Sequence, residues 1–314
     1  MTNETTEIKK GLSITLVGAI SGLVADSIMH PIDTIRARLQ VEKVGKSQYN
    51  GTFHAMNMIL KNEGVKYLYK GFPIVATATV PAHALYFYGY EESKRILSST
   101  FPQWGSGSLG HFISGFVADA FGSLVWVPMD IIKQRLQVQT NTQKLNPNQT
   151  LYKGSFHAAN VIFKEEGIKG FYRGFWPALL TFGPYVGIYF TVYEKSKSLL
   201  SKYYFGEQYT LKNQPTLPIY YQLCSGFFAG SVGAGLTCPL DVIKTRIQVQ
   251  RKSDTQQYKG IYDAAKTILR EEGYQAFIKG MGARIMWIAP GSALTIAACM
   301  YILFYTLFLY LKRT

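Results

Sequence analysis

The sequence has little charge and little cysteine for its length. Only 17% of its 314 residues are Asp, Glu, Lys or Arg, whereas soluble domains average about 25%. The three cysteines, Cys224, Cys238 and Cys299, lie in or beside apolar runs, which argues against a disulfide framework. No nucleophile–base pair and no closed set of metal ligands recurs, so neither an enzyme nor a bound cofactor is expected.

Charged residues are missing from several long stretches. Residues 71–90, 174–193, 213–240 and 285–311 contain none, and residues 11–29 and 108–129 contain one acid each, Asp26 and Asp119. A helix of about 20 apolar residues can cross a bilayer. The sequence therefore predicts an all-α membrane protein with six transmembrane helices. Because no signal-peptide or Arg-rich transit pattern precedes them, both termini are expected on one side of the membrane.

Bases outnumber acids, and the net charge is +14. A nucleic-acid partner is not expected, because there is no recognition module and the bases do not form one stripe. The bases lie mainly beside the apolar runs. Positive charge in such places orients a membrane chain and suits anionic lipid head groups.

One motif occurs three times, at residues 31–40, 128–137 and 239–248, with the pattern Pro-x-Asp-x-x-basic-x-Arg-(Leu/Ile)-Gln. A Tyr-x-Gly element and a Glu-Gly element follow each copy. Self-similarity at a regular period is the signature of a repeat architecture. We expect three repeats, residues 1–102, 103–206 and 207–314, related by pseudo-threefold symmetry within one transmembrane domain. Each repeat should contain two transmembrane helices and one short amphipathic helix between them.

The motif prolines and charges predict a particular junction. Pro31, Pro128 and Pro239 should kink their helices, because proline removes a backbone hydrogen bond and clashes with the preceding turn. The acid and base of each motif are three residues apart and share one helical face. Each acid should meet the base of the adjoining repeat: Asp33 with Lys133, Asp130 with Lys244, and Asp241 with Arg36. Further along the helices, Gln40, Gln137 and Gln248 are expected to brace these pairs by hydrogen bonds.

A simpler interpretation is that these charges are membrane-flanking anchors. It accounts for Arg38, Arg135 and Arg246. It does not account for three acids in register, because Asp in or near a span is costly unless it is paired or hydrated. A ring of ion pairs would close one end of the helix barrel and could open again, which predicts a gate.

The three tandem motifs and the elements that follow them resemble the mitochondrial carrier family, over about residues 11–312. The resemblance implies six tilted helices around a water-filled cavity, three short matrix helices, and alternating access in the mitochondrial inner membrane. The termini would face the intermembrane space, and the ring would be the matrix gate. Cardiolipin would bind at matrix-helix N-termini and basic-Gly turns, where backbone N–H groups and positive charge are presented: Gly51, Lys70, Gly71, Gly154, Arg173, Gly174, Gly260, Lys279 and Gly280.

The family also has a cytoplasmic gate of the form aromatic-acid-x-x-base on the even-numbered helices. Glu91 with Lys94 and Glu194 with Lys197 match this pattern. The third copy has Met300 and Leu303 in place of the acid and the base. Of the pairs expected around this gate, only Glu91 with Lys197 keeps both partners. We therefore expect the conformation open to the intermembrane space to be favoured.

The resemblance also implies solute contacts midway along the even-numbered helices, at Ala78, Thr79, Thr181, Phe182, Trp287 and Ile288. None is charged, which counts against a strongly anionic solute. Arg284, one turn away, and Asp26, five residues before Pro31, are further candidates. Either could instead pair locally with a neighbour.

Three interpretations of function stay open. The first is a transporter of an undetermined small solute. The second is a divalent metal carrier, because His83 and its surroundings resemble the mitoferrin branch, in which a histidine at this place handles metal. The third is a structural subunit of a membrane complex that keeps the carrier fold with degenerate transport. A monomer is expected unless the chain is such a subunit.

Overall fold

The computed structural model describes residues 2–45, 47–100, 108–140, 150–206, 218–252 and 258–311. The side chains of residues 2–18, 108, 109, 111, 112, 296, 297 and 299–311 lie outside this description. Every regular element in the described ranges is a helix, and there is no strand among them.

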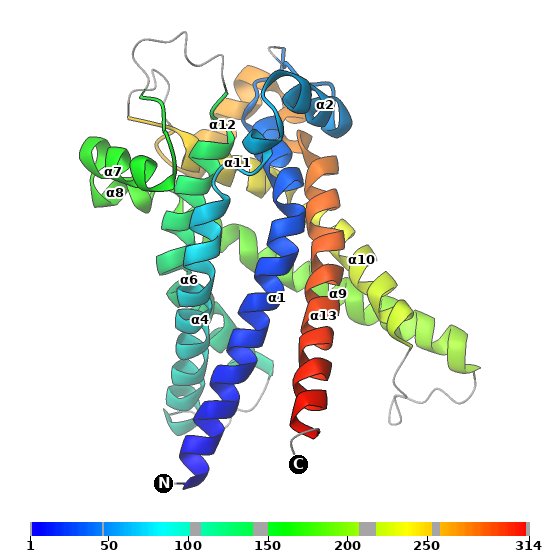
Figure 1. The fold of residues 1–314 in the computed structure, drawn as a ribbon. Coiled ribbons are helices and arrows are strands. Elements are labelled where there is room, and N and C mark those ends of the chain that lie inside the picture. The colour runs from blue at the N-terminus through cyan, green and yellow to red at the C-terminus, as the bar shows by residue number, and fades with distance from the viewer. Residues whose placement is uncertain are drawn as a thin grey trace.

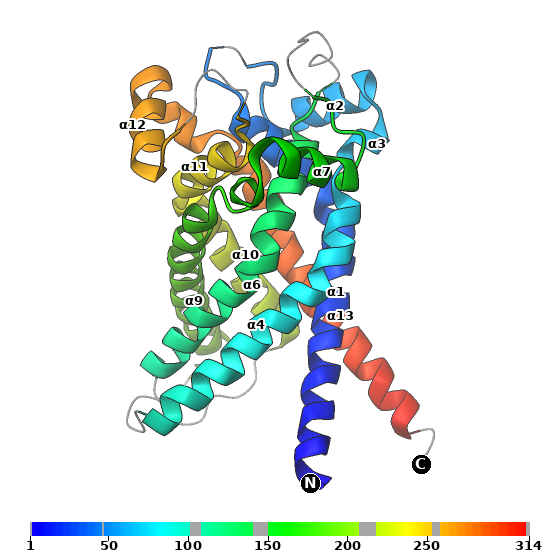
Figure 2. The same cartoon turned by 90° about the vertical axis from the view of Figure 1, so that its left-hand side faces the viewer.

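Long helices extend from the end that holds the short helices toward the opposite end, and α9 and α10 run obliquely to the others (Figure 1, Figure 2). In the described part of the chain they are α1 (Thr2–Val41), α4 (Phe72–Thr100), α6 (Ser108–Gln137), α9 (Phe175–Phe205), the pair α10 (Ile219–Leu236) and α11 (Cys238–Val249), and α13 (Met281–Leu311). Each packs against the next in chain order, and α13 packs against α1. The ring therefore has no free edge and surrounds a common axis.

Short helices gather at one end of the molecule, and the two chain ends lie at the other (Figure 1). The short helices are α2 (Thr52–Asn62), α3 (Val65–Leu68), α7 (Ser155–Glu166), α8 (Ile168–Phe171), α12 (Ile261–Glu272) and the 3₁₀ helix η3 (Tyr274–Ile278). The longer of them are amphipathic, as their apolar spacing predicts. In the first repeat, Ala55 and Ile59 are buried against Ile35 and Leu39 of α1.

The other repeats use the same packing. Ile162 of α7 packs with Ile131 of α6, and Ile268 of α12 packs with Ile243 of α11. Burying one such side chain stabilises the fold by about 1.5–3 kcal/mol. Three equivalent cores therefore hold each short helix against the motif helix of its own repeat.

The motif prolines have different effects in the three repeats. Pro31 lies inside α1 and Pro128 inside α6, and both helices continue through the proline. At Pro239 the helix breaks, and α10 and α11 meet at 63°. Gly233 and Gly235 stand just before this break, and glycine weakens a helix interior. The helical path that was expected to be kinked alike in each repeat is therefore interrupted in the third.

Within the described residues, two helical stretches are long and apolar enough to cross a membrane by composition alone, Ile113–Gln137 and Ile168–Phe205. The bent pair α10–α11 makes a third if it is counted as one span.

The start of α9 shows how closely neighbouring repeats approach. Gly174 has φ +103°, and a Cβ atom there would lie 2.7 Å from Cγ of Gln248 on α11. Both the left-handed backbone and this contact require glycine. The basic-Gly turn of the second repeat is therefore part of the joint with the third repeat.

Candidate functional site

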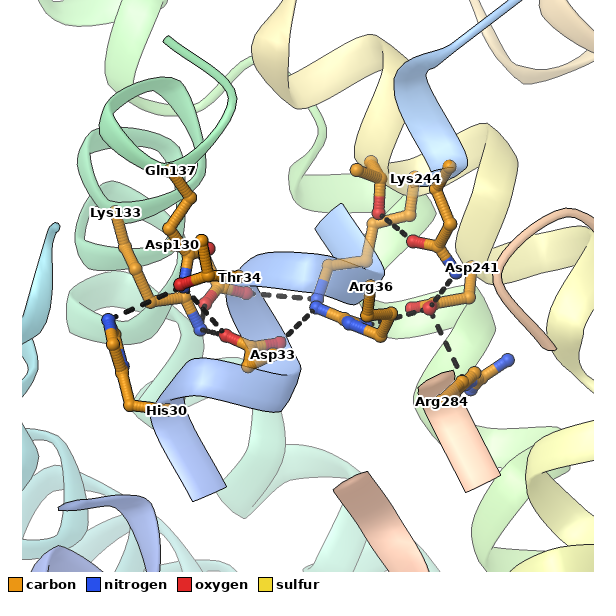
Figure 3. A network of polar contacts seen from close by, with 12 residues as sticks. His30, Asp33, Thr34, Arg36, Asp130, Lys133, Gln137, Asp241, Lys244 and Arg284 are labelled. Atoms are coloured by element: carbon orange, nitrogen blue, oxygen red, sulfur yellow. Dashed lines mark hydrogen bonds and ion pairs between the residues drawn. The ribbon is translucent and has the colours of Figure 1, made fainter. Parts of the chain in front are cut away.

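The acid–base pairs expected from the sequence form where α1, α6 and α11 converge (Figure 3). The Arg36 guanidinium lies 2.7 Å from Asp241, Lys133 Nζ lies 3.2 Å from Asp33, and Lys244 Nζ lies 2.9 Å from Asp130. Each pair joins two different repeats. We call these six residues the charge ring.

Further contacts link the pairs into one network. Asp33 lies 2.8 Å from Arg36 on the same helix, and Asp130 lies 3.2 Å from Lys133. Asp33 and Asp241 are nearly inaccessible to solvent. Removing one partner of a buried ion pair typically costs about 3–5 kcal/mol, because the other charge is left uncompensated. The charge ring therefore joins the three repeats through linked ion pairs.

Two of the three expected glutamine braces form. Gln40 Nε2 donates to Asp241 at 2.8 Å, and Gln137 Nε2 donates to Asp33 at 3.2 Å. The side-chain amide of Gln248 is fully buried and has no hydrogen-bond partner among the described residues. The prediction that Gln248 also braces these pairs is therefore wrong.

Threonines explain the difference between the braces. Thr34 accepts a hydrogen bond from Gln137, and Thr245 donates one to the side-chain oxygen of Gln40. In the second repeat the positions that correspond to Thr34 and Thr245 hold Ile131 and Gln134. Neither residue carries a hydroxyl, so the threonine contact that accompanies each of the other two braces has no equivalent at Gln248.

The arginine two residues after the ring base of each motif has a structural role that the sequence analysis missed. Each pairs with the glutamate of the Glu-Gly element in its own repeat: Arg38 with Glu63, Arg135 with Glu166, and Arg246 with Glu272. Each also donates through Nε to the main-chain oxygen of a motif glutamine in another repeat, as Arg38 does to Gln137 at 2.8 Å. The recurring Glu-Gly was the available signal. These arginines tie each short helix to the neighbouring repeat rather than merely flanking a membrane.

Glu272, at the end of α12, is the glutamate that pairs with Arg246 in the third repeat. It accepts hydrogen bonds from Arg246 and from the backbone N–H of Val44 in the first repeat. Burial raises the pKa of this carboxyl, but the Arg246 and Val44 hydrogen bonds lower it more, so the net pKa lies below the ordinary value of 4.5. The carboxylate form is the one that holds the first and third repeats together.

A cavity of about 350 Å³ lies against the charge ring. Its walls include Asp26, Thr181, Phe182, Arg284, Trp287 and Ile288, all of them solute-contact candidates from the sequence. Ring residues Arg36, Asp130, Lys133, Asp241 and Lys244 also line it. Sequence reasoning missed Tyr185, Ser292 and Thr295, which lie on the same two helices and bring hydroxyl groups to the cavity. The cavity and the charge ring therefore form one continuous site.

The remaining candidates on α4 do not line this cavity. Ala78 is buried with Val75 and Met129 where α4 packs against α6, and the Thr79 hydroxyl donates to the Val75 oxygen at 2.7 Å. His83 Nδ1 lies 2.8 Å from the Thr79 oxygen, and its ring packs edge-on against Trp126. Because α4 packs closely against α6, these side chains belong to the packed region between the two helices rather than to the cavity wall.

The structure also bears on the metal role expected of His83. No group of three or more His, Cys, Asp or Glu side chains that could hold a metal occurs in the described residues. His83 is instead held by a backbone oxygen and an indole ring. These contacts are those of a packed histidine.

Comparison with known proteins agrees with the division into three repeats. A family profile described as "Mitochondrial carrier protein" matches residues 9–101, 105–204 and 215–307. The chain belongs to the mitochondrial carrier family. It is 69% identical over 291 residues to mitochondrial substrate carrier family protein E of Dictyostelium discoideum, covering 92% of this chain and 94% of that protein. It is 33% identical to S-adenosylmethionine carrier 1, chloroplastic/mitochondrial, of Arabidopsis thaliana, covering 89% of this chain and 74% of that protein.

Mitoferrin of Dictyostelium discoideum is 31% identical to this carrier, covering 92% of each chain. That identity is no higher than the identity to a carrier with a different named solute. As a member of this family, the chain is a multi-pass transporter of the mitochondrial inner membrane. The similarity leaves its solute undetermined.

At the end of the carrier that holds the chain termini, the charges of the second gate stand apart. Glu91 and Glu194 are exposed, and Lys94 and Lys197 are half-buried. None of these four forms an ion pair within 4.0 Å with another described side chain, so the expected pair Glu91–Lys197 is not made. The side chains of Met300 and Leu303 lie outside the described ones. In this conformation the ion pairs of the charge ring are formed, whereas Glu91, Lys94, Glu194 and Lys197 form none with a described side chain.

The lipid-site candidates lie beside the joints between repeats. Gly51, Gly154 and Gly260 immediately precede α2, α7 and α12. A cavity of about 370 Å³ brings Arg173 and Gly174 of the second repeat to Lys259 and Gly260 of the third.

The bases of the three basic-Gly turns are in contact with other groups. Lys70 lies over the Tyr67 ring, Arg173 lies 3.3 Å from Glu166, and Lys279 lies 3.7 Å from Glu42. Among the predicted lipid glycines, Gly71 lies against Lys133 of the second repeat and Gly280 against Gln40 of the first. These turns therefore hold repeats together as well as lining the joints.

Proposed function

We propose that this carrier moves a small solute across the mitochondrial inner membrane by alternating access, with the charge ring as its matrix gate. The three ion pairs that join all three repeats beside the cavity carry this proposal. The end with α2, α7 and α12 then faces the matrix, and both termini face the intermembrane space. A transporter of this kind needs no catalytic group.

Solute binding supplies the energy for the change of state. The solute has to bind the conformation in which the ring is open more tightly than the conformation in which it is closed, since only differential affinity shifts a population. Ring residues line the cavity, so a solute there can exchange contacts with them as the pairs separate. Glu91, Lys94, Glu194 and Lys197 make no ion pair with another described side chain in this conformation, and in this proposal the pair Glu91–Lys197 forms in the other state.

A thermal-shift screen followed by uptake into liposomes tests the proposal. The full chain is purified in cardiolipin-containing detergent and screened against divalent metals, nucleotides, cofactors, dicarboxylates and amino acids. A transporter is stabilised by at least one class, and that class enters liposomes that contain the protein. Lys133→Gln should abolish uptake, because Lys133 contacts acids of two repeats. The exposed Arg95, which pairs with Glu92 on its own helix, supplies the control Arg95→Gln.

Two alternatives have distinct outcomes in the same experiment. A mitoferrin-like carrier would be stabilised by Fe²⁺ or Mn²⁺ alone, and His83→Ala would remove that response. A structural subunit would respond to no solute and would purify in a fixed ratio with partner proteins. A monomer that binds a solute excludes the structural subunit.

We propose further that cardiolipin occupies the joints between repeats. The cavity between the second and third repeats supports this, because Arg173, Lys259 and the start of α12 meet there. Backbone N–H groups at a helix start and nearby bases together suit a phosphate. Binding of labelled cardiolipin to Lys259→Gln, compared with the exposed Arg270→Gln, tests this site.

A further inference from the structure

Two charged side chains in the cavity stand outside the charge ring, Asp26 on α1 and Arg284 on α13. Asp26 lines the cavity and makes no hydrogen bond or ion pair with a described residue. Arg284 is 3% exposed, and its Nη1 has no hydrogen-bond partner in the described part of the chain. Its Nε lies 3.4 Å from Asp241, so the guanidinium reaches the ring while one terminal nitrogen is left over (Figure 3).

These two residues also balance each other in charge. The charge ring consists of three acids and three bases. Asp26 adds one negative charge and Arg284 one positive charge. With these two included, the acids and bases named here are equal in number. A solute with a single charge would leave one charge in excess when water is excluded, which is costly within a membrane. A solute with one charge of each sign satisfies both and keeps the cavity neutral.

The chemistry of each residue indicates which charge it binds. A guanidinium matches a carboxylate through paired N–H donors, better than a point charge does. A carboxylate such as Asp26 accepts hydrogen bonds from an ammonium or attracts another cationic group. The two ends of the solute are therefore distinguished.

Aromatic rings also line the cavity. The Cζ atom of Arg36 lies 4.6 Å from the centroid of the Trp287 ring, so the guanidinium already covers one face of this indole. Phe182 and Tyr185 of α9 also line the cavity and make no such contact with a described cation. An apolar or cationic side group could pack against these rings.

We infer that the carried solute is a zwitterion of the α-amino acid type, with its carboxylate at Arg284, its ammonium at Asp26 and its side group against Phe182 and Tyr185. This inference rests on the transport function proposed above. It excludes dicarboxylates and bare metal ions as the main solutes, because each would bring only one sign of charge.

Matched chemical sets test the charge requirement. L-phenylalanine, L-methionine and L-arginine are each compared with their methyl ester, which lacks the carboxylate charge, and their N-acetyl derivative, which lacks the ammonium. We expect a thermal shift and liposome uptake from at least one parent amino acid, with both its derivatives weakened about 10-fold or more, since a hydrogen bond to a charged group has that effect. Equal binding of a parent and either derivative overturns the inference.

Variants test the two assigned residues. Asp26→Asn should weaken binding of the parent amino acid about 10-fold or more while leaving its methyl ester no better than before. Arg284→Lys keeps the charge beside Asp241 but loses the paired donors, and it should weaken carboxylate binding. Asp26→Lys should improve binding of the N-acetyl derivative. Glu92→Gln and Arg270→Gln, charge changes at exposed pairs away from the cavity, serve as controls.

The two proposals fail in different ways. Uptake of dicarboxylates, nucleotides or metals without any zwitterion overturns the inference and leaves the transport function standing. No response to any solute class, in a protein that unfolds cooperatively, overturns both. If a variant does not fold, the comparison of each wild-type parent with its two derivatives still decides the inference.

Discussion

Arg36 of the first repeat lies 2.7 Å from Asp241 of the third, 205 residues away along the chain. Gln40 and Arg284 approach the same carboxylate at 2.8 and 3.4 Å. Asp241 is therefore the point at which the first repeat, the third motif helix and the wall of the cavity meet. A solute that engages Arg284 also changes the surroundings of a ring residue, which provides a direct route from binding to opening.

A double-mutant cycle measures the strength of this pair. Arg36→Gln and Asp241→Asn should each lower the free energy of unfolding by about 3–5 kcal/mol, because each leaves a buried charge without a main partner. The double variant should cost less than the sum of the two by about 0.5–3 kcal/mol, the usual range for residues in contact. Thermal and chemical unfolding in detergent provide the measurement. Strict additivity would show that the two charges are not coupled.

The braces provide a contrast between equivalent residues. Gln137→Leu should destabilise the carrier by about 1–3 kcal/mol, because the Asp33 carboxylate and Thr34 lose a buried donor. Gln248→Leu should be neutral or stabilising, because a buried amide without a partner is replaced by an apolar group. Unfolding temperatures of the two variants measured side by side check this order, and the reverse order would contradict it.

Gly174 and Gly183 form a matched pair on the second repeat. Gly174→Ala should cost about 2–4 kcal/mol, because φ is +103° and the new Cβ would press against Gln248. A Cβ at Gly183 meets no atom within 4 Å, so Gly183→Ala should change stability little or favour the helix. Similar unfolding temperatures for the two variants would show that the joint tolerates the contact.

The incomplete second gate predicts a shift of conformation. Restoring an acid and a base through Met300→Glu with Leu303→Lys should favour the state in which the even-numbered helices close and the charge ring opens. Labelling of a cysteine placed in the cavity, by a reagent added from either side of a liposome, measures the shift. The exchanged pair Met300→Lys with Leu303→Glu is the control for charge alone. Unchanged labelling in the restored variant would rule out this gate.

Glu272 predicts a pH dependence of the tie between the first and third repeats. Its pKa is lowered in the folded carrier, so its contribution is fully present above the ordinary value of 4.5 and is lost as pH falls through the lower folded pKa. Glu272→Gln should therefore be less stable than the wild type at neutral pH, and the difference should shrink as pH falls below that value. Unfolding temperatures of both proteins between about pH 3 and pH 7 measure this. A constant difference would contradict the role of the charge.

Much of the charge ring was predictable from the repeats. Three acids in register, each three residues before a base, can be compensated only by neighbouring copies if the copies surround one axis. The pairs Asp33–Lys133, Asp130–Lys244 and Asp241–Arg36 followed from that symmetry, and the structure contains all three. The roles of Arg38, Arg135 and Arg246 were not seen, because an arginine at a helix end pairs as readily with lipid or solvent as with a distant glutamate.

The sequence by itself determined the repeats, the helices and the identity of the charges at the junction, because these depend on composition and spacing along the chain. Only the tertiary structure decided where the symmetry is broken. The Gln248 amide lacks a hydrogen-bond partner among the described residues, and the third motif helix breaks where the others continue. It also decided that Asp26 and Arg284 share a cavity while Ala78, Thr79 and His83 pack between helices. These outcomes depend on which faces of helices far apart in sequence are pressed together, and no local pattern contains that information.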